Sequence, residues 1–82
     1  MAVTVRYFAA ARAAAGVEDE TIDLPAGATV ADLVGGLAAR GTGLATVLAR
    51  CSYLCDGVAV RDMLIPLHSG QTVDVLPPFA GG

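Results

Sequence analysis

The chain has 82 residues, five arginines, no lysine and a formal net charge of −3. This length allows one domain with a modest core, because so short a chain buries only about 60–65% of its unfolded surface. The scattered arginines form no basic patch, which argues against nucleic-acid binding, and no apolar run approaches the roughly 20 residues that span a bilayer. The first ten residues do not resemble a signal peptide, so a cytoplasmic location is expected.

The first 24 residues predict a strand, a short helix and a second strand. In VTVRYF, residues 3–8, apolar and polar side chains alternate, so Phe8 faces the same side as Arg6 and away from the valines. The alanine-rich segment that follows favours a short helix, which Gly16 ends. ETIDL, residues 20–24, is typical of a second strand that pairs with the first.

The clearest helix is expected over residues 30–40. Thr29 is a good N-cap, and Asp32 completes a shortened capping box. Gly41 suits the position that follows the helix end. Two glycines at 35–36 cost about 1 kcal/mol each relative to alanine, and a close approach of the helix to a sheet would explain them.

The second half of the chain predicts a further helical turn or two and three strands. LATVLARC favours the helical turns, and the loop RDMLIPLHSGQ favours a short helical turn near its centre. SYLC, residues 52–55, and VAV, residues 58–60, flank an Asp-Gly pair that is typical of a two-residue hairpin. TVDVL, residues 72–76, is the last strand, and Pro77 ends it because proline has no backbone donor.

These elements predict an α+β domain of ββαββ order, with one main helix on one face of a mixed four- to five-stranded sheet. One helix covers only one face, so the opposite face stays open, and the alternation assigns Phe8 and Leu76 to it. An apolar pair on an open face is a candidate partner surface, although isolated surface hydrophobes are the alternative.

The cysteines and the single histidine do not predict a metal or redox site. Cys51 and Cys55 have neither the redox spacing nor enough histidine partners for zinc. Two side chains four residues apart on a strand lie about 13 Å from each other, too far for a disulfide. Free, half-buried thiols and a solvated loop position for His68 are therefore expected.

The segments VRYFAAARAAAG and PLHSGQTVDVLPPFAGG resemble the small subunit of molybdopterin synthase, a sulfur carrier with the ubiquitin-like β-grasp fold. The resemblance covers nearly the whole chain, and its most specific part is the final Pro-Pro-aromatic-x-Gly-Gly. Asp56 stands where asparagine is common in that family, and Gln71 where an acid is common. The resemblance implies that the first and last strands are central parallel neighbours, which would set Phe8 beside Leu76.

The resemblance also implies a division into a β-grasp domain, residues 1–76, and a flexible Gly-Gly tail, residues 77–82. Gly82 would carry the reacting group. A ubiquitin-activating-like adenylyltransferase would use ATP to adenylate the Gly82 carboxylate, and a sulfur donor would convert it to a thiocarboxylate. The large catalytic subunit, in a heterotetramer with this chain, would then receive the sulfur for a pterin precursor of the molybdenum cofactor.

In this picture the chain is a donor subunit that binds no cofactor of its own and supplies no catalytic side chain. Two alternatives stay open: a sulfur carrier for thiazole or cysteine biosynthesis, and a ubiquitin-like modifier or binding module. The expected partner-binding residues are Phe8, Arg12, Leu76, Pro77, Pro78, Phe79, Ala80 and Gly81, with Arg12 expected at the end of the first strand near the open face.

Overall fold

A computed structural model describes residues 1–78 of the chain. It contains one five-stranded sheet with the strand order β2-β1-β5-β3-β4. The strands are β1 (Ala2–Tyr7), β2 (Asp19–Asp23), β3 (Ser52–Cys55), β4 (Val58–Ala59) and β5 (Thr72–Leu76), and the helices are α1 (Ala9–Ala15), α2 (Val30–Ala38) and α3 (Thr42–Leu48).

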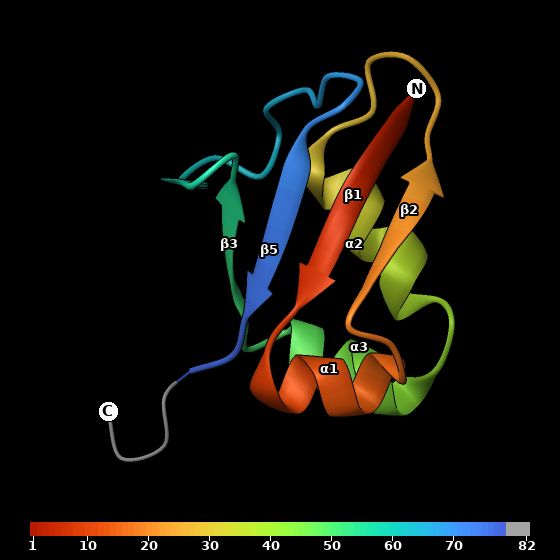
Figure 1. Cartoon of the computed structure of the whole chain (residues 1–82), viewed down its shortest axis with the longest axis vertical. Helices are drawn as coiled ribbons and strands as arrows, with labels where there is room; N and C mark the ends of the chain where they lie inside the picture. Colours follow the sequence, from red (N-terminus) through yellow and green to blue (C-terminus); the bar gives the residue numbers. More distant parts are fainter. Residues whose placement is uncertain (79–82) are drawn as a thin grey trace.

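The two central strands run parallel and the outer pairs run antiparallel. β1 pairs with β5 in parallel, whereas β2 pairs with β1, and β3 with both β5 and β4, in the antiparallel sense. In Figure 1 the helices lie behind the sheet or at its lower end, so the face toward the viewer is uncovered. The α+β class and the mixed sheet are confirmed, but the expectation of one main helix is wrong because the described chain has three helices.

The core lies between the sheet and the helices. Alternation along β1 and β5 sends their valines toward the helices, as the sequence predicts. Side chains from all three helices pack against those valines. The buried cluster consists of Val3, Val5, Tyr7, Ala11, Val30, Leu33, Leu37, Leu44, Leu48, Tyr53, Leu67, Val73 and Val75.

The main helix starts as predicted and ends two residues early. Both capping-box hydrogen bonds form, from the Asp32 amide to the Thr29 hydroxyl at 3.1 Å and from the Thr29 amide to the Asp32 carboxylate at 2.9 Å. Gly41 does not end α2 in the left-handed conformation; its φ of 170° is extended, and it precedes α3 instead. Gly35 and Gly36 are exposed with open space around them, so the predicted close approach to the sheet is wrong and nothing in the structure explains the pair.

The predicted hairpin forms at Asp56 and Gly57. Their φ values of 48° and 81° are both positive, as a two-residue turn of the I′ type requires. The Thr72 amide donates to the Asp56 carboxylate at 2.9 Å, which ties the turn to β5. In the loop that follows, the bond from the Ile65 amide to the Asp62 carbonyl makes one tight turn, and the predicted helical turn is absent from the described loop.

A buried tyrosine anchors a polar network at the β2 edge of the sheet. The Tyr7 hydroxyl and the Arg40 guanidinium both donate to Glu20 Oε2 at 2.7 Å. The Arg40 hydrogen bond, assisted by the bond from Tyr7, lowers the pKa of Glu20 despite partial burial. Burial, reinforced by the bond to Glu20, raises the pKa of Tyr7, so this hydroxyl remains a donor. The network joins β1, β2 and the end of α2.

Glu20→Gln is expected to destabilise the fold by about 1–2 kcal/mol at neutral pH, because the charge-assisted bonds become neutral ones. The folded pKa of Glu20 is lowered, so its contribution is present above the ordinary glutamate pKa of about 4.3 and is lost as pH falls through the folded value. Urea unfolding at neutral pH and near pH 3 measures this, and the difference from the wild type should shrink in acid. The exposed Glu18→Gln is the matched control; a difference that is constant with pH would contradict the assignment.

Candidate functional site

The last strand delivers the chain toward its C-terminal residues at the end of the sheet where β1 also ends. Tyr7 and Val75 are parallel partners, and the Phe8 amide donates to the Val75 carbonyl at 3.2 Å. One step further along each strand brings Phe8 and Leu76 to the same end of the open face. Pro77 follows directly, so the predicted partner residues Phe8, Leu76 and Pro77 are brought together.

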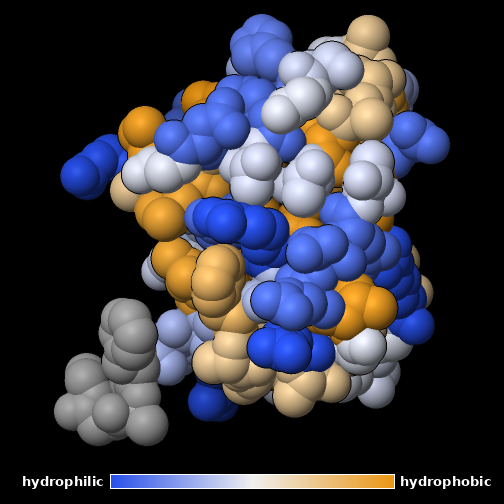
Figure 2. All heavy atoms as spheres, in the orientation of Figure 1, coloured by the Kyte–Doolittle hydropathy of each residue, from blue (hydrophilic) through white to orange (hydrophobic). Residues whose placement is uncertain are grey.

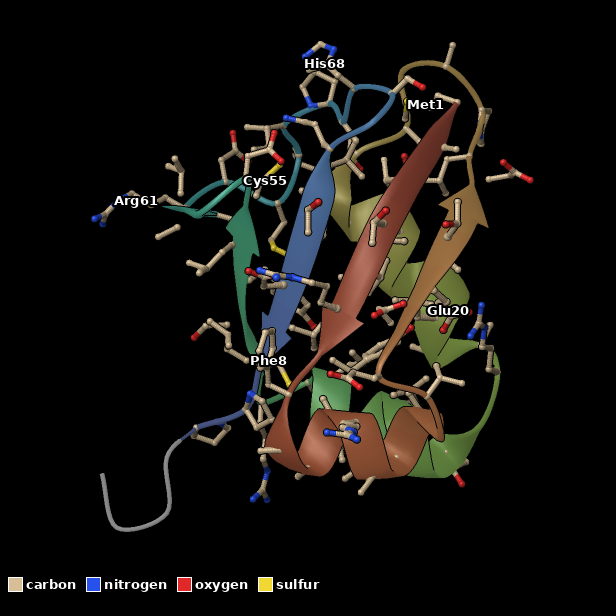
Figure 3. All side chains as sticks on the ribbon, viewed as in Figure 1. Met1, Phe8, Glu20, Cys55, Arg61 and His68 are labelled. Atoms are coloured by element: carbon tan, nitrogen blue, oxygen red, sulfur yellow. The ribbon has the colours of Figure 1, made fainter. Side chains whose placement is uncertain are left out.

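Phe8 is exposed because it lies between two elements. It ends the alternation of β1 on the open side and serves as the N-cap of α1 without a side-chain capping bond. Phe8 is 39% exposed, which is a large fraction for a phenylalanine. Figure 3 shows Phe8 at the lower end of the central strands, where α1 begins.

The centre of the open face holds an ion pair that sequence reasoning missed. Nε and Nη2 of Arg6 donate to the two carboxylate oxygens of Asp74 at 2.6 and 2.8 Å. The Arg6 guanidinium also lies over the Phe8 ring, 5.7 Å from its centroid. The sequence does place opposite charges on two strands that were expected to be parallel neighbours. The ion pair could still not be predicted, because the register that aligns Arg6 with Asp74 cannot be deduced from either strand alone.

Arg12 lies in the middle of α1, not at the end of the first strand as the sequence analysis placed it. Its guanidinium is 3.7 Å from the Glu18 carboxylate, and both side chains are more than half exposed. It lines a cavity of about 240 Å³ together with Arg6, Phe8 and Asp19. Arg12 therefore lies near Phe8, but its guanidinium already has an acidic neighbour, Glu18, within the chain.

A shallow groove lies at the root of the C-terminal segment. It has a volume of about 350 Å³ and is formed by α1, α3 and the two prolines. Pro77 is half-buried and Pro78 is exposed. The lining residues are Ala10, Thr46, Val47, Arg50, Pro77 and Pro78.

Figure 2 shows a strongly hydrophilic centre on the open face, with apolar residues gathered toward its β3 side. Leu76 is half-buried there and is the register partner of Ser52 on β3. Four of the predicted residues lie outside the described residues: Phe79, Ala80, Gly81 and Gly82. The predicted division into a domain and a flexible tail, residues 77–82, depends on these four.

The remaining reactive side chains do not gather into a site within the described part of the chain. Cys51 and Cys55 are free and half-buried, and burial raises the pKa of both thiols. His68 is exposed on the loop before β5, at the upper end of the view in Figure 3. Between residues 1 and 78 there is no cluster of ligands that could hold a metal ion and no helix able to cross a membrane.

The chain is similar to known proteins over nearly its whole length. The model of the ThiS family matches residues 5–82. The molybdopterin synthase sulfur carrier subunit of Chlamydomonas reinhardtii is 34% identical over 83 residues, which cover both chains completely. The protein of the same name from Homo sapiens is 33% identical over 82 residues, covering 98% of this chain and 93% of the relative.

Solved structures share the whole architecture. A protein described as molybdopterin converting factor subunit 1, from Pyrococcus furiosus, superimposes with a TM-score of 0.87 at 32% identity, covering 96% of this chain and 99% of that one. A complex of subunits 1 and 2 of the molybdopterin-converting factor from Helicobacter pylori contains a chain with a TM-score of 0.74 and 26% identity, with full coverage of both. SAMP1 of Haloferax volcanii has a TM-score of 0.86 at 22% identity and full coverage of both, so it shares the fold alone. These matches confirm the β-grasp class.

Proposed function

This chain belongs to the ThiS family, and on that premise we propose that it is the sulfur-carrier subunit of a molybdopterin synthase. Its proposed reacting group is the carboxylate of Gly82. The observation that carries the proposal is the similarity over the whole chain to two molybdopterin synthase sulfur carrier subunits, at 34% and 33% identity. Phe8, Leu76 and Pro77 lie at the end of the two central strands, so β5 ends beside an exposed aromatic side chain that a partner can cover.

The proposed chemistry begins with activation, because a carboxylate is a poor electrophile. A carboxylate oxygen of Gly82 attacks the α-phosphorus of ATP on an adenylyltransferase partner, forming an acyl-adenylate and releasing pyrophosphate. Sulfide-level sulfur, HS−, from a donor then attacks the acyl carbon and AMP leaves, which gives the thiocarboxylate. In the large subunit, the thiocarboxylate sulfur attacks a carbon of the pterin precursor, so that a C–S bond forms as the bond from that carbon to an oxygen leaving group breaks. Water then cleaves the acyl–sulfur bond, which leaves the sulfur on the pterin and returns the Gly82 carboxylate.

The residues of the final segment suit insertion into a partner. Six residues from Pro77 to Gly82 reach at most about 20 Å when extended, enough to enter a neighbouring subunit. Two prolines favour an extended start, which lowers the entropy lost on insertion. Glycines at 81 and 82 have no side chain to obstruct a narrow channel. The large-subunit partner is supported by the Helicobacter pylori complex of subunits 1 and 2.

Incubation with ATP, the cognate activating enzyme and a sulfur donor is expected to raise the intact mass by about 16 Da, as one oxygen becomes sulfur. Mass spectrometry of the whole chain measures this, and omission of ATP is the control. Attachment to lysines of other proteins without any sulfur uptake would favour a modifier instead. Sulfur uptake followed by transfer only in thiazole or cysteine synthesis would keep the carrier chemistry and change the pathway.

A further inference from the structure

The ion pair at the centre of the open face is asymmetric in exposure. Arg6 and Asp74 are register partners on the two central strands. The Asp74 side chain is only 8% exposed, whereas that of Arg6 is 51% exposed. Both carboxylate oxygens accept from Arg6, so Asp74 presents nothing to a partner, and the guanidinium presents its outer edge.

That outer edge must find an acceptor when the face is covered. A guanidinium carries five N–H donors, and within residues 1–78 only Nε and Nη2 of Arg6 make hydrogen bonds to protein atoms. The remaining donors of a half-exposed side chain face water in the free protein. A partner that displaces this water without supplying an acceptor would leave charged donors unsatisfied, which is costly.

The surrounding charges restrict the kind of acceptor. Arg6 is paired in register with Asp74 on β5 and with Asp19 on β2, so one positive side chain lies between two acidic positions. Arg12 and Glu18 line the same cavity with opposite charges, so a third carboxylate brought by a partner would still be repelled by Asp74 and Asp19. An uncharged oxygen, such as a main-chain carbonyl or the amide oxygen of asparagine or glutamine, accepts the donors without that repulsion.

We propose that Arg6 is a specificity-determining residue of the partner-binding face, and that the partner meets its outer edge with an uncharged oxygen acceptor. Asp74 is the positioning residue, because it fixes the guanidinium without itself reaching the partner. The same guanidinium lies over the Phe8 ring, so Asp74, Arg6 and Phe8 form one chain of contacts from the sheet centre to the apolar end. This inference rests on the proposed function, which supplies the large subunit as the partner.

The main test compares binding of full-length variants to the cognate large subunit by calorimetry. The double variant Arg6→Met with Asp74→Val should stay folded, because replacing both partners of an ion pair by apolar residues is often neutral for stability. It is expected to bind about 10- to 100-fold more weakly, the loss typical of a hydrogen-bonded charged donor. Arg61→Met is the matched control, since Arg61 is exposed and points away from Phe8 (Figure 3).

Two further variants separate recognition from packing. Arg6→Lys keeps the charge but loses the planar fork, and it should weaken binding nearly as much as the double variant. Asp74→Asn should weaken binding less, and it should add nothing when Arg6 is already methionine, because it acts through Arg6. Unfolding curves measured on each variant check that the fold is retained.

The salt dependence tests the nature of the acceptor. The ratio of dissociation constants between the double variant and the wild type should stay within about twofold as salt rises, because an uncharged acceptor leaves little to screen. A ratio that collapses at high salt would mean a charged acceptor and overturn that part. Full affinity in the double variant would overturn the proposal and leave the Arg6–Asp74 pair with a structural role only. Failure of the wild-type chain to bind the large subunit would instead count against the proposed function.

Discussion

Deleting Gly82, or adding one residue after it, is expected to abolish sulfur transfer and leave the fold intact. Deletion shortens the reach of the segment by about 3.5 Å, and a displacement of reacting groups by 1 Å can already cost about 100-fold in rate. Addition moves the carboxylate past its site and places a side chain where glycine is needed. Single-turnover transfer to the pterin precursor, followed together with intact mass, measures the loss.

The fold should not respond, because every residue of the buried cluster lies between Val3 and Val75. Circular dichroism and urea unfolding of the two length variants are therefore expected to match those of the wild type. Arg61→Met is the control, since Arg61 is exposed and its substitution leaves the final segment unchanged. Normal transfer by the shortened chain would mean that the reacting carboxylate does not need Gly82.

Most of the fold could be predicted from local sequence patterns. Period-two alternation placed Phe8 and Leu76 on the open face, because neighbouring side chains of a strand point to opposite faces whatever the strand pairs with. The capping box at Thr29 and the Asp-Gly hairpin were equally local, and both formed as expected. The helix end was less predictable, because Gly41 suits the end of one helix as well as the start of the next.

Contacts between distant segments could not be deduced in the same way. The Arg6–Asp74 pair joins residues 68 positions apart, and its two hydrogen bonds need the parallel register of β1 and β5. The network of Tyr7, Glu20 and Arg40 likewise depends on where α2 ends over the edge of the sheet. Each of these side chains alone looks like an ordinary strand or helix residue, so the polar part of the site appears only in three dimensions.

Phe8→Asp is expected to weaken binding to the large subunit by at least about 2 kcal/mol while leaving the fold stable, because a carboxylate that is hydrated in the free chain must be desolvated under the partner. The structure strengthens the stability half of this expectation. Phe8 is the N-cap of α1 and has no side-chain capping bond. Aspartate is among the best N-cap residues and typically contributes about 1 kcal/mol there, which offsets part of the burial lost with the ring, so the fold should remain intact. Calorimetric binding and thermal unfolding measure the two effects separately.

Leu76→Asp probes the same surface from the other central strand. Leu76 is half-buried, so some loss of stability accompanies the change, but the loss of affinity should exceed it. Leu64→Asp is the matched control, because this leucine is 72% exposed on the loop before β5. Figure 1 shows that this loop lies at the opposite end of the sheet from the start of α1. Equal weakening by all three variants would point to an effect of net charge, and severe unfolding by Phe8→Asp would show that its ring contributes to the core. Selective weakening at Phe8 and Leu76 would place the partner on the end of the sheet where the last strand leaves, which is where a segment of six residues can deliver Gly82 to another subunit.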